Sequence, residues 1–103
     1  MELNEYQSEA WRFARANNPL ERAFGLFEES GEVAGLYKRN YRDNTHPDEF
    51  RQKLTKELGD VLWYVSGVAK DNGITLDEVA KTNIAKLADR VERGVLHGSG
   101  DER

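Results

Sequence analysis

Phe27-Glu28-Glu29-Ser30-Gly31-Glu32-Val33 is the stretch of sequence that decides the fold, and Lys56-Glu57-Leu58-Gly59-Asp60-Val61 repeats its pattern. In each stretch two acids lie three residues apart, with a glycine directly before the second acid: Glu29 and Glu32, then Glu57 and Asp60. Residues three apart project from the same side of an α-helix. Each stretch is therefore predicted to form a helix that presents a pair of carboxylates on one face.

The residues around both acid pairs are mostly apolar or small, which is typical of helices that pack against other helices. If the two helices lie side by side, four carboxylates converge on one point. Carboxylates in such a place repel one another and are seldom left unpaired. An all-oxygen ligand set suits Mg²⁺ or Mn²⁺ better than Zn²⁺. The sequence therefore predicts a divalent metal site, against the simpler alternative of two acidic, solvated helix faces.

The glycine before each second acid calls for an explanation, because glycine inside a helix costs roughly 1 kcal/mol relative to alanine. Gly31 and Gly59 occupy the same offset from their acids. Two explanations are open. Either the helices approach closely at these positions, or the glycines leave room for a ligand beside the acids.

Four helices are predicted from apolar spacing, capping residues and breaks, over about 3–16, 19–41, 48–70 and 76–92. Asn18 is the expected N-cap of the second helix, and Thr75 begins a capping-box sequence before the fourth. No stretch alternates as a strand does, so the fold class is all-α, a four- to five-helix bundle. Residues 1–93 form the helical domain. Residues 94–103 are a glycine-rich tail, either a frayed end or a flap over the site.

Composition narrows the function further. The 103 residues carry a net charge of −4, which disfavours binding to nucleic acid through a basic surface. The absence of cysteine excludes disulfides, zinc-thiolate sites and thiol nucleophiles. No apolar run is long enough to span a bilayer, and a cytoplasmic protein is expected. The small core expected of such a chain favours association into a dimer.

Other side chains are candidates for contact with a substrate. Asn83 shares a predicted helix face with apolar residues and is either a satisfied core amide or a hydrogen-bonding group for a ligand. Lys86, one turn later, would reach an anion, and Lys53 would offset phosphate charge. Trp11 is a candidate for stacking on a base. No histidine lies three residues after a glutamate, which argues against a di-iron carboxylate site, and no motif supports a Ser-His-Asp triad.

These motifs together resemble the MazG-like, all-α nucleoside triphosphate pyrophosphohydrolases. The resemblance rests on Glu-Glu-Ser-Gly-Glu at 28–32, Glu-Leu-Gly-Asp at 57–60 and Asn-Ile-Ala-Lys-Leu at 83–87, and it covers roughly residues 20–90. It implies that Mg²⁺ binds to four acids: Glu29, Glu32, Glu57 and Asp60. It places Asn83 and Lys86 at the phosphate side. It also implies a homodimer or homotetramer whose substrate pockets are formed partly by the neighbouring chain.

The reaction that the resemblance implies is cleavage of a nucleoside triphosphate between its α and β phosphates, which gives a monophosphate and pyrophosphate. Such a reaction needs cations on the phosphate oxygens and a positioned water. Glu28 or Glu29 is the candidate to accept a proton from that water. Two alternatives stay open: a related hydrolase acting on another phosphoanhydride, such as a phosphoribosyl-nucleotide, and a non-catalytic helical module for oligomerisation or binding.

Overall fold

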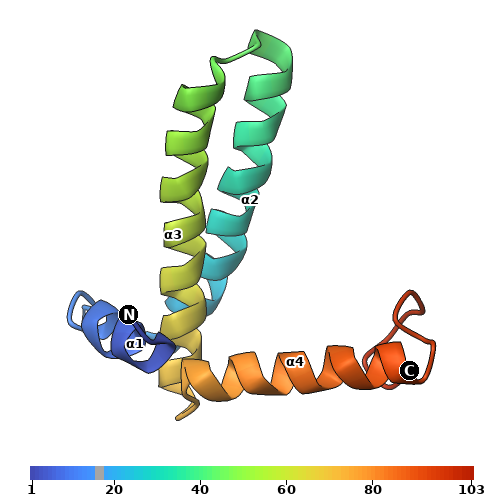
Figure 1. The fold of residues 1–103 in the computed structure, drawn as a ribbon. Coiled ribbons are helices and arrows are strands. Elements are labelled where there is room, and N and C mark those ends of the chain that lie inside the picture. The colour runs from blue at the N-terminus through green and yellow to red at the C-terminus, as the bar shows by residue number, and fades with distance from the viewer. Residues whose placement is uncertain (16–17) are drawn as a thin grey trace.

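The computed structural model describes residues 1–15 and 18–103, and this part of the chain folds into four α-helices without a strand (Figure 1). The predicted all-α class is therefore confirmed. The helices are α1 (Leu3–Trp11), α2 (Pro19–Asp43), α3 (Pro47–Asp71) and α4 (Leu76–Glu92). The predicted bounds of the last three differ from these by two residues or fewer.

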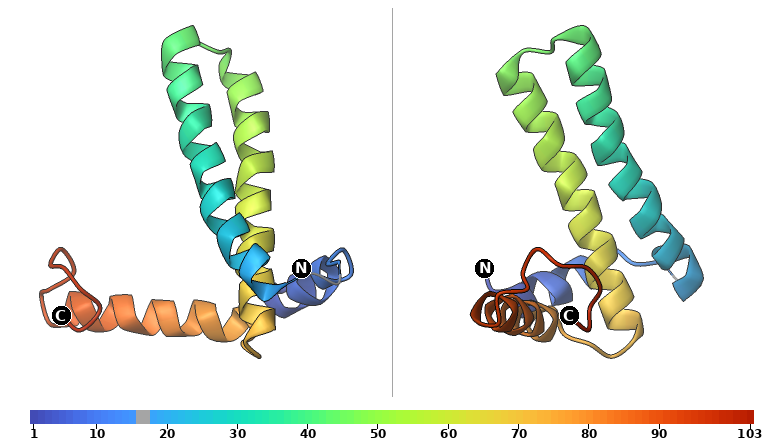
Figure 2. Two further views of the ribbon diagram at one scale, coloured as in Figure 1. Left: turned by 180° about the vertical axis from the view of Figure 1, so that it is seen from behind. Right: turned by 90° about the vertical axis from the view of Figure 1, so that its right-hand side faces the viewer.

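The α2–α3 hairpin is the main body of the fold, in which the two longest helices run antiparallel side by side (Figures 1 and 2). Asn44 ends α2 in the left-handed conformation, with φ of 52°, which asparagine tolerates better than most residues. His46 Nδ1 then accepts a hydrogen bond of 3.2 Å from the Asp48 amide, and Pro47 opens α3. This short connection forces the two helices to be neighbours.

The two N-caps that the sequence predicts are both present. The Asn18 side chain accepts a hydrogen bond from the Leu20 amide at 2.8 Å. The Thr75 hydroxyl accepts one from the Glu78 amide at 3.1 Å. Each bond satisfies an amide that has no partner within its helix.

Helix α1 is shorter than predicted. It ends at Trp11, and the amides of the next three residues bond to carbonyls three positions back, so that the chain tightens into turns. The predicted end of this helix at about residue 16 lies outside the described residues. Phe13, which falls within the predicted range 3–16, lies beyond the observed end of α1 and is 69% exposed.

Hydrogen bonds of the Gln7 side chain connect α1 to the rest of the molecule. Its buried amide donates to the Ile74 carbonyl at 2.9 Å and to the Ser66 carbonyl at 3.4 Å, and its oxygen accepts from the Leu76 amide at 3.1 Å. Nearby, the Trp63 indole donates to the Ala10 carbonyl at 3.0 Å. Gln7 thus joins α1 to the end of α3 and the start of α4.

A buried ion pair joins α2 to the C-terminal end of α3. Arg22 meets Asp71 through two hydrogen bonds of 2.6 Å, and both side chains are less than a tenth exposed. The guanidinium lies 5.0 Å from the centre of the Trp11 ring, an arrangement suited to a cation–π interaction. This two-pronged geometry is the strong form of an arginine–carboxylate contact.

Helix α4 extends away from the hairpin rather than along it (Figure 2). Among the described helices it contacts α1 and α3 but not α2, mainly near its N-terminal end. The radius of gyration is 16.4 Å, against about 13 Å for a compact chain of this length. No helix in the described part of the chain is long and apolar enough to cross a membrane.

Candidate metal centre

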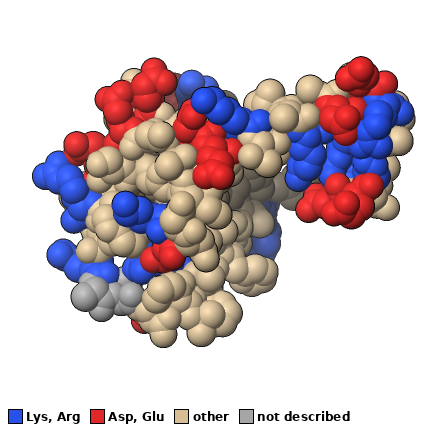
Figure 3. Space-filling model, turned by 90° about the horizontal axis from the view of Figure 1, so that it is seen from below, with Lys and Arg blue, Asp and Glu red and all other residues tan. Residues whose placement is uncertain are grey.

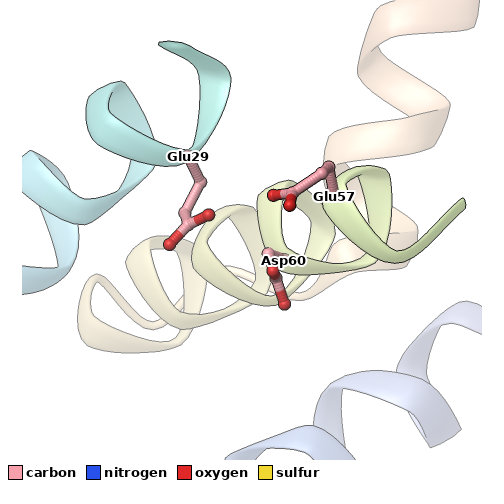
Figure 4. A group of neighbouring side chains, drawn as sticks. All are labelled: Glu29, Glu57 and Asp60. Carbon is pink, nitrogen blue, oxygen red and sulfur yellow. The ribbon is translucent and has the colours of Figure 1, made fainter. Parts of the chain in front are cut away.

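Three of the four predicted acids meet on the α2–α3 hairpin. Carboxylate oxygens of Glu29, Glu57 and Asp60 lie within 4.8 Å of one another, and we call these residues the acidic cluster. Figure 4 shows Glu29 reaching from α2 toward the two acids of α3. Glu57 and Asp60 share a face of α3 because they are three residues apart, as the sequence pattern predicts.

The electrostatics of the acidic cluster suit a divalent cation. Burial raises the pKa of Glu29, and the charges of Asp60 and Glu57 raise this pKa further. In the described part of the chain, no lysine or arginine forms an ion pair with any member of the cluster. Three carboxylates without a basic partner form an oxygen ligand set of the kind that Mg²⁺ and Mn²⁺ prefer.

Two further acids of α2 lie beside the cluster. Glu32, the fourth predicted ligand, is exposed and is not a member of the cluster, although its charge also raises the pKa of Glu29. Glu28 is exposed and lines a groove of about 420 Å³ between α2 and α3, with Glu21, Arg22, Phe24, Gly25 and Tyr64. This groove begins one helical turn from the cluster, because Gly25 and Tyr64 lie four residues from Glu29 and Asp60 respectively.

Gly31 and Gly59 do not mark close contacts between helices within the chain. A methyl group added at either position would meet no atom within 4 Å outside its own helix. The close approach is at Gly25 instead, where an added Cβ would lie 2.2 Å from the Tyr64 ring. Of the two explanations for the paired glycines, open space beside the acids fits the chain, and close packing of α2 on α3 at these positions is wrong.

Two predicted substrate-binding residues, Lys53 and Trp11, lie on different helices, α3 and α1. Lys53 lies on α3 one turn before Glu57, exposed, in an ion pair of 2.8 Å with Glu49. Trp11, at the end of α1, is half-buried against Arg22 and also lines a small cavity with Gln7 and Thr75. Trp11 therefore contributes to packing in this chain.

Asn83 and Lys86 lie on α4, apart from the acidic cluster. Both line an open groove of about 380 Å³ on this helix, with Ile74, Glu78, Val79 and Thr82. Asn83 is exposed, so the core-amide alternative is wrong, because α4 is not covered by another helix along its length. Helices α2 and α4 do not contact each other. One chain thus does not bring Asn83 or Lys86 together with Glu29.

Tyr6 is a residue beside the cluster that the sequence pattern did not single out. Burial raises the pKa of its hydroxyl, and the negative charge of Asp60 raises it further. Its position among apolar residues of the first helix is the feature of the sequence that could have pointed to a buried Tyr6. This position does not indicate that Asp60, more than fifty residues later, lies nearby.

Comparisons of the sequence with known proteins identify a family. Residues 18–95 match the family described as the MazG nucleotide pyrophosphohydrolase domain. The chain is 43% identical over 81 residues to "Gene 37 protein" of Mycobacterium phage L5, covering 77% of this chain and 71% of that protein. It is 30% identical over 94 residues to "Uncharacterized protein YvdC" of Bacillus subtilis (strain 168), covering 84% and 86% respectively.

No solved structure gives a significant match. The family match spans most of the chain and includes α2, α3 and α4, and therefore every member of the acidic cluster. The chain belongs to the MazG nucleotide pyrophosphohydrolase family.

Proposed function

We propose that this protein hydrolyses nucleoside triphosphates between the α and β phosphates, with Mg²⁺, to give a nucleoside monophosphate and pyrophosphate. The observation that carries the proposal is the acidic cluster, in which two helices of a MazG-family chain hold three carboxylates within 4.8 Å. Little covalent chemistry is required of the protein in such a reaction. It must position the phosphates and a water, and it must compensate negative charge.

In this proposal Glu29, Glu57 and Asp60 hold Mg²⁺, or Mn²⁺ in its place, and Glu32 completes the ligand set by turning inward from its exposed position. A divalent cation bound there would neutralise phosphate charge and act as a Lewis acid. Glu28 or Glu29 accepts the proton of the attacking water. Glu28 suits this role because it lines the groove beside the cluster and is not a member of it.

The remaining substrate contacts divide between two surfaces. Lys53, one turn from Glu57, needs only to leave Glu49 to meet a phosphate near the cluster. Trp11 packs against Arg22, which lines the groove beside the cluster, so a base bound in that groove is its expected contact. Asn83 and Lys86 lie on α4, which does not contact α2, and do not reach the cluster within one chain. We therefore assign the contacts of Asn83 and Lys86 to a site that a second copy completes, in a homodimer or homotetramer.

The chain's surface supports association. Its accessible area is 7,928 Å², against about 5,900 Å² for a compact monomer of this mass. Several large apolar side chains are more than half exposed on α2 and α4, among them Phe24, Phe27, Ile84 and Val91. An excess of about 2,000 Å² per chain corresponds to about 4,000 Å² in total for two chains, which is in the range that obligate homodimers bury.

The test is pyrophosphate release from a panel of canonical and modified nucleoside triphosphates, with Mg²⁺ and with EDTA. Release with Mg²⁺ and none with EDTA is expected. Glu57→Gln and Asp60→Asn are expected to lower kcat/KM by about 100-fold or more. Asp48→Asn, on the same helix but outside the acidic cluster, serves as the matched control and keeps activity near that of the unchanged protein.

Full Mg²⁺-dependent activity in both variants of the cluster would refute the assignment of the metal ligands. No release from any triphosphate would exclude the proposed substrates. Release of a product from a phosphoribosyl-nucleotide would then identify another phosphoanhydride as the substrate. If neither occurs and Mg²⁺ does not raise the melting temperature, the non-catalytic alternative holds.

A further inference from the structure

Residues 94–103 fold back onto the end of α4. Gly94 and Gly100 adopt positive φ values of 72° and 82°, which let the chain reverse twice. The Arg103 side chain donates to the carbonyls of Val95 and Leu96, both at 2.8 Å, and to that of Gly100 at 2.6 Å. These bonds give the glycine-rich tail a defined shape.

Asp101, on this tail, binds two cations of α4. Its carboxylate lies 3.2 Å from the Lys86 ammonium and 3.3 Å from the Arg90 guanidinium. The same Arg90 nitrogen donates to the carbonyls of Gly100 and Asp101. Figure 3 shows this end of α4, at the right, with basic and acidic side chains intermingled.

The tail buries one of these cations almost completely. Arg90 is only 5% exposed, and its Nε has no hydrogen-bond partner in the described part of the chain. Asp101, by contrast, is 81% exposed at its side chain. A buried guanidinium held by one exposed carboxylate and two carbonyls is incompletely compensated, which is costly in an apolar setting.

Three side chains of α4 that donate hydrogen bonds lie on the face of the helix that the tail partly covers. Asn83, Lys86 and Arg90 are spaced by three and four residues, so they share one face of the helix. Asn83 and Lys86 line the groove of about 380 Å³, and Arg90 extends this face under residues 100 and 101. An amide, an ammonium and a guanidinium in a row are suited to successive phosphate oxygens.

We propose that Asp101 occupies the position of a substrate phosphate on Lys86 and Arg90, so that the tail is a reversible cover over a polyphosphate-binding face of α4. This inference rests on the proposed function for the identity of the ligand, and it adds Arg90 to the phosphate contacts and Asp101 as their internal competitor. A pyrophosphate group carries more negative charge than one carboxylate and therefore displaces it. The pair between Lys86 and Asp101 is exposed and therefore contributes little to holding the cover closed.

The experiment is calorimetric binding of inorganic pyrophosphate in EDTA, where the acidic cluster holds no metal and hydrolysis plays no part. Asp101→Asn is expected to bind pyrophosphate about threefold to tenfold more tightly than the unchanged protein. Glu102→Gln removes the next acid in sequence, which is also exposed and forms no ion pair in the described part of the chain, and should leave the affinity unchanged. Adding Lys86→Met to Asp101→Asn should abolish the gain.

Hydrogen exchange provides a second readout that needs no variant. Pyrophosphate is expected to speed amide exchange in residues 94–103 of the unchanged protein. Equal affinity of Asp101→Asn and Glu102→Gln, or no change in exchange of the tail, would overturn the proposal. Since neither measurement uses turnover, a protein that hydrolyses no triphosphate can still pass both, and an active enzyme can fail both.

Discussion

At the scale of single residues, Glu29 is the acid of the acidic cluster whose pKa is shifted by its surroundings. Its pKa is raised above its ordinary value of 4.5, first by burial and then by the charges of Asp60 and Glu57. The native state therefore binds a proton that the unfolded state has already released just above pH 4.5. The metal-free protein should lose stability as the pH rises through this window, the opposite of a salt-bridged acid.

We expect Glu29→Gln to raise the melting temperature of the metal-free protein at pH 7, because it removes a charge from a group of like charges. It should also flatten the fall of stability as the pH rises above about 4.5. Thermal unfolding in EDTA across this range measures both effects. Glu9→Gln, an exposed acid of α1, is the control, and equal behaviour of the two variants would contradict the electrostatic account.

The acid pairs were predictable at this scale because i and i+3 spacing fixes which side chains share a helix face. The sequence did not reveal that Glu32 faces solvent while Glu29 faces α3. That difference depends on how α2 is rotated against α3, and the close contact of Gly25 with the Tyr64 ring helps to set this rotation.

At the scale of helices, the glycines of α2 have opposite roles. Gly25→Ala should destabilise the protein by about 1–3 kcal/mol, since the new methyl group would overlap the Tyr64 ring. Gly31→Ala meets no atom and should stabilise the helix by about 0.5–1 kcal/mol. Urea unfolding of both variants measures the contrast. Stabilisation by both substitutions would show that the helices do not meet at Gly25.

Gln7 offers a second test at this scale. Gln7→Leu keeps the approximate volume but leaves the Ile74 carbonyl and the Leu76 amide without their partner. A loss of about 1–4 kcal/mol is expected from one buried and one part-buried group left without a partner. Ser8→Ala, at the exposed neighbouring position, should change stability by less than about 0.5 kcal/mol. A similar small effect of Gln7→Leu would refute the role assigned to the side chain.

The helices and their caps were predictable because they depend on residues close in sequence, as with Asn18 and Thr75. Gln7 and the Arg22–Asp71 pair were not, because each depends on partners about fifty to seventy positions away. In a helical pattern Gln7 and Arg22 are simply polar residues, and their burial follows only from how the helices pack.

At the scale of the whole molecule, the acidic cluster and Lys86 lie apart in one chain. We therefore predict that two inactive variants regain activity when they are mixed. If a second copy completes each site, Asp60→Asn and Lys86→Met are each inactive alone, but a mixed dimer regains one intact site. Refolding the two variants together should restore up to about a quarter of the original pyrophosphate release, since half of the dimers are mixed and each has one of two sites. Mixing Asp60→Asn with Glu57→Gln, which damage the same side of the site, should restore nothing.

The three bonds of Gln7 also bear on the order in which the chain folds. They close loops of 59 to 69 residues, whereas α2 and α3 are neighbours joined by three residues. Contacts between segments that are close in sequence form fast. Contacts between distant segments form more slowly, because closing a long loop costs entropy. We therefore expect the hairpin to be structured in the folding transition state and the first helix to join it afterwards, so that Gln7→Leu accelerates unfolding and hardly slows refolding.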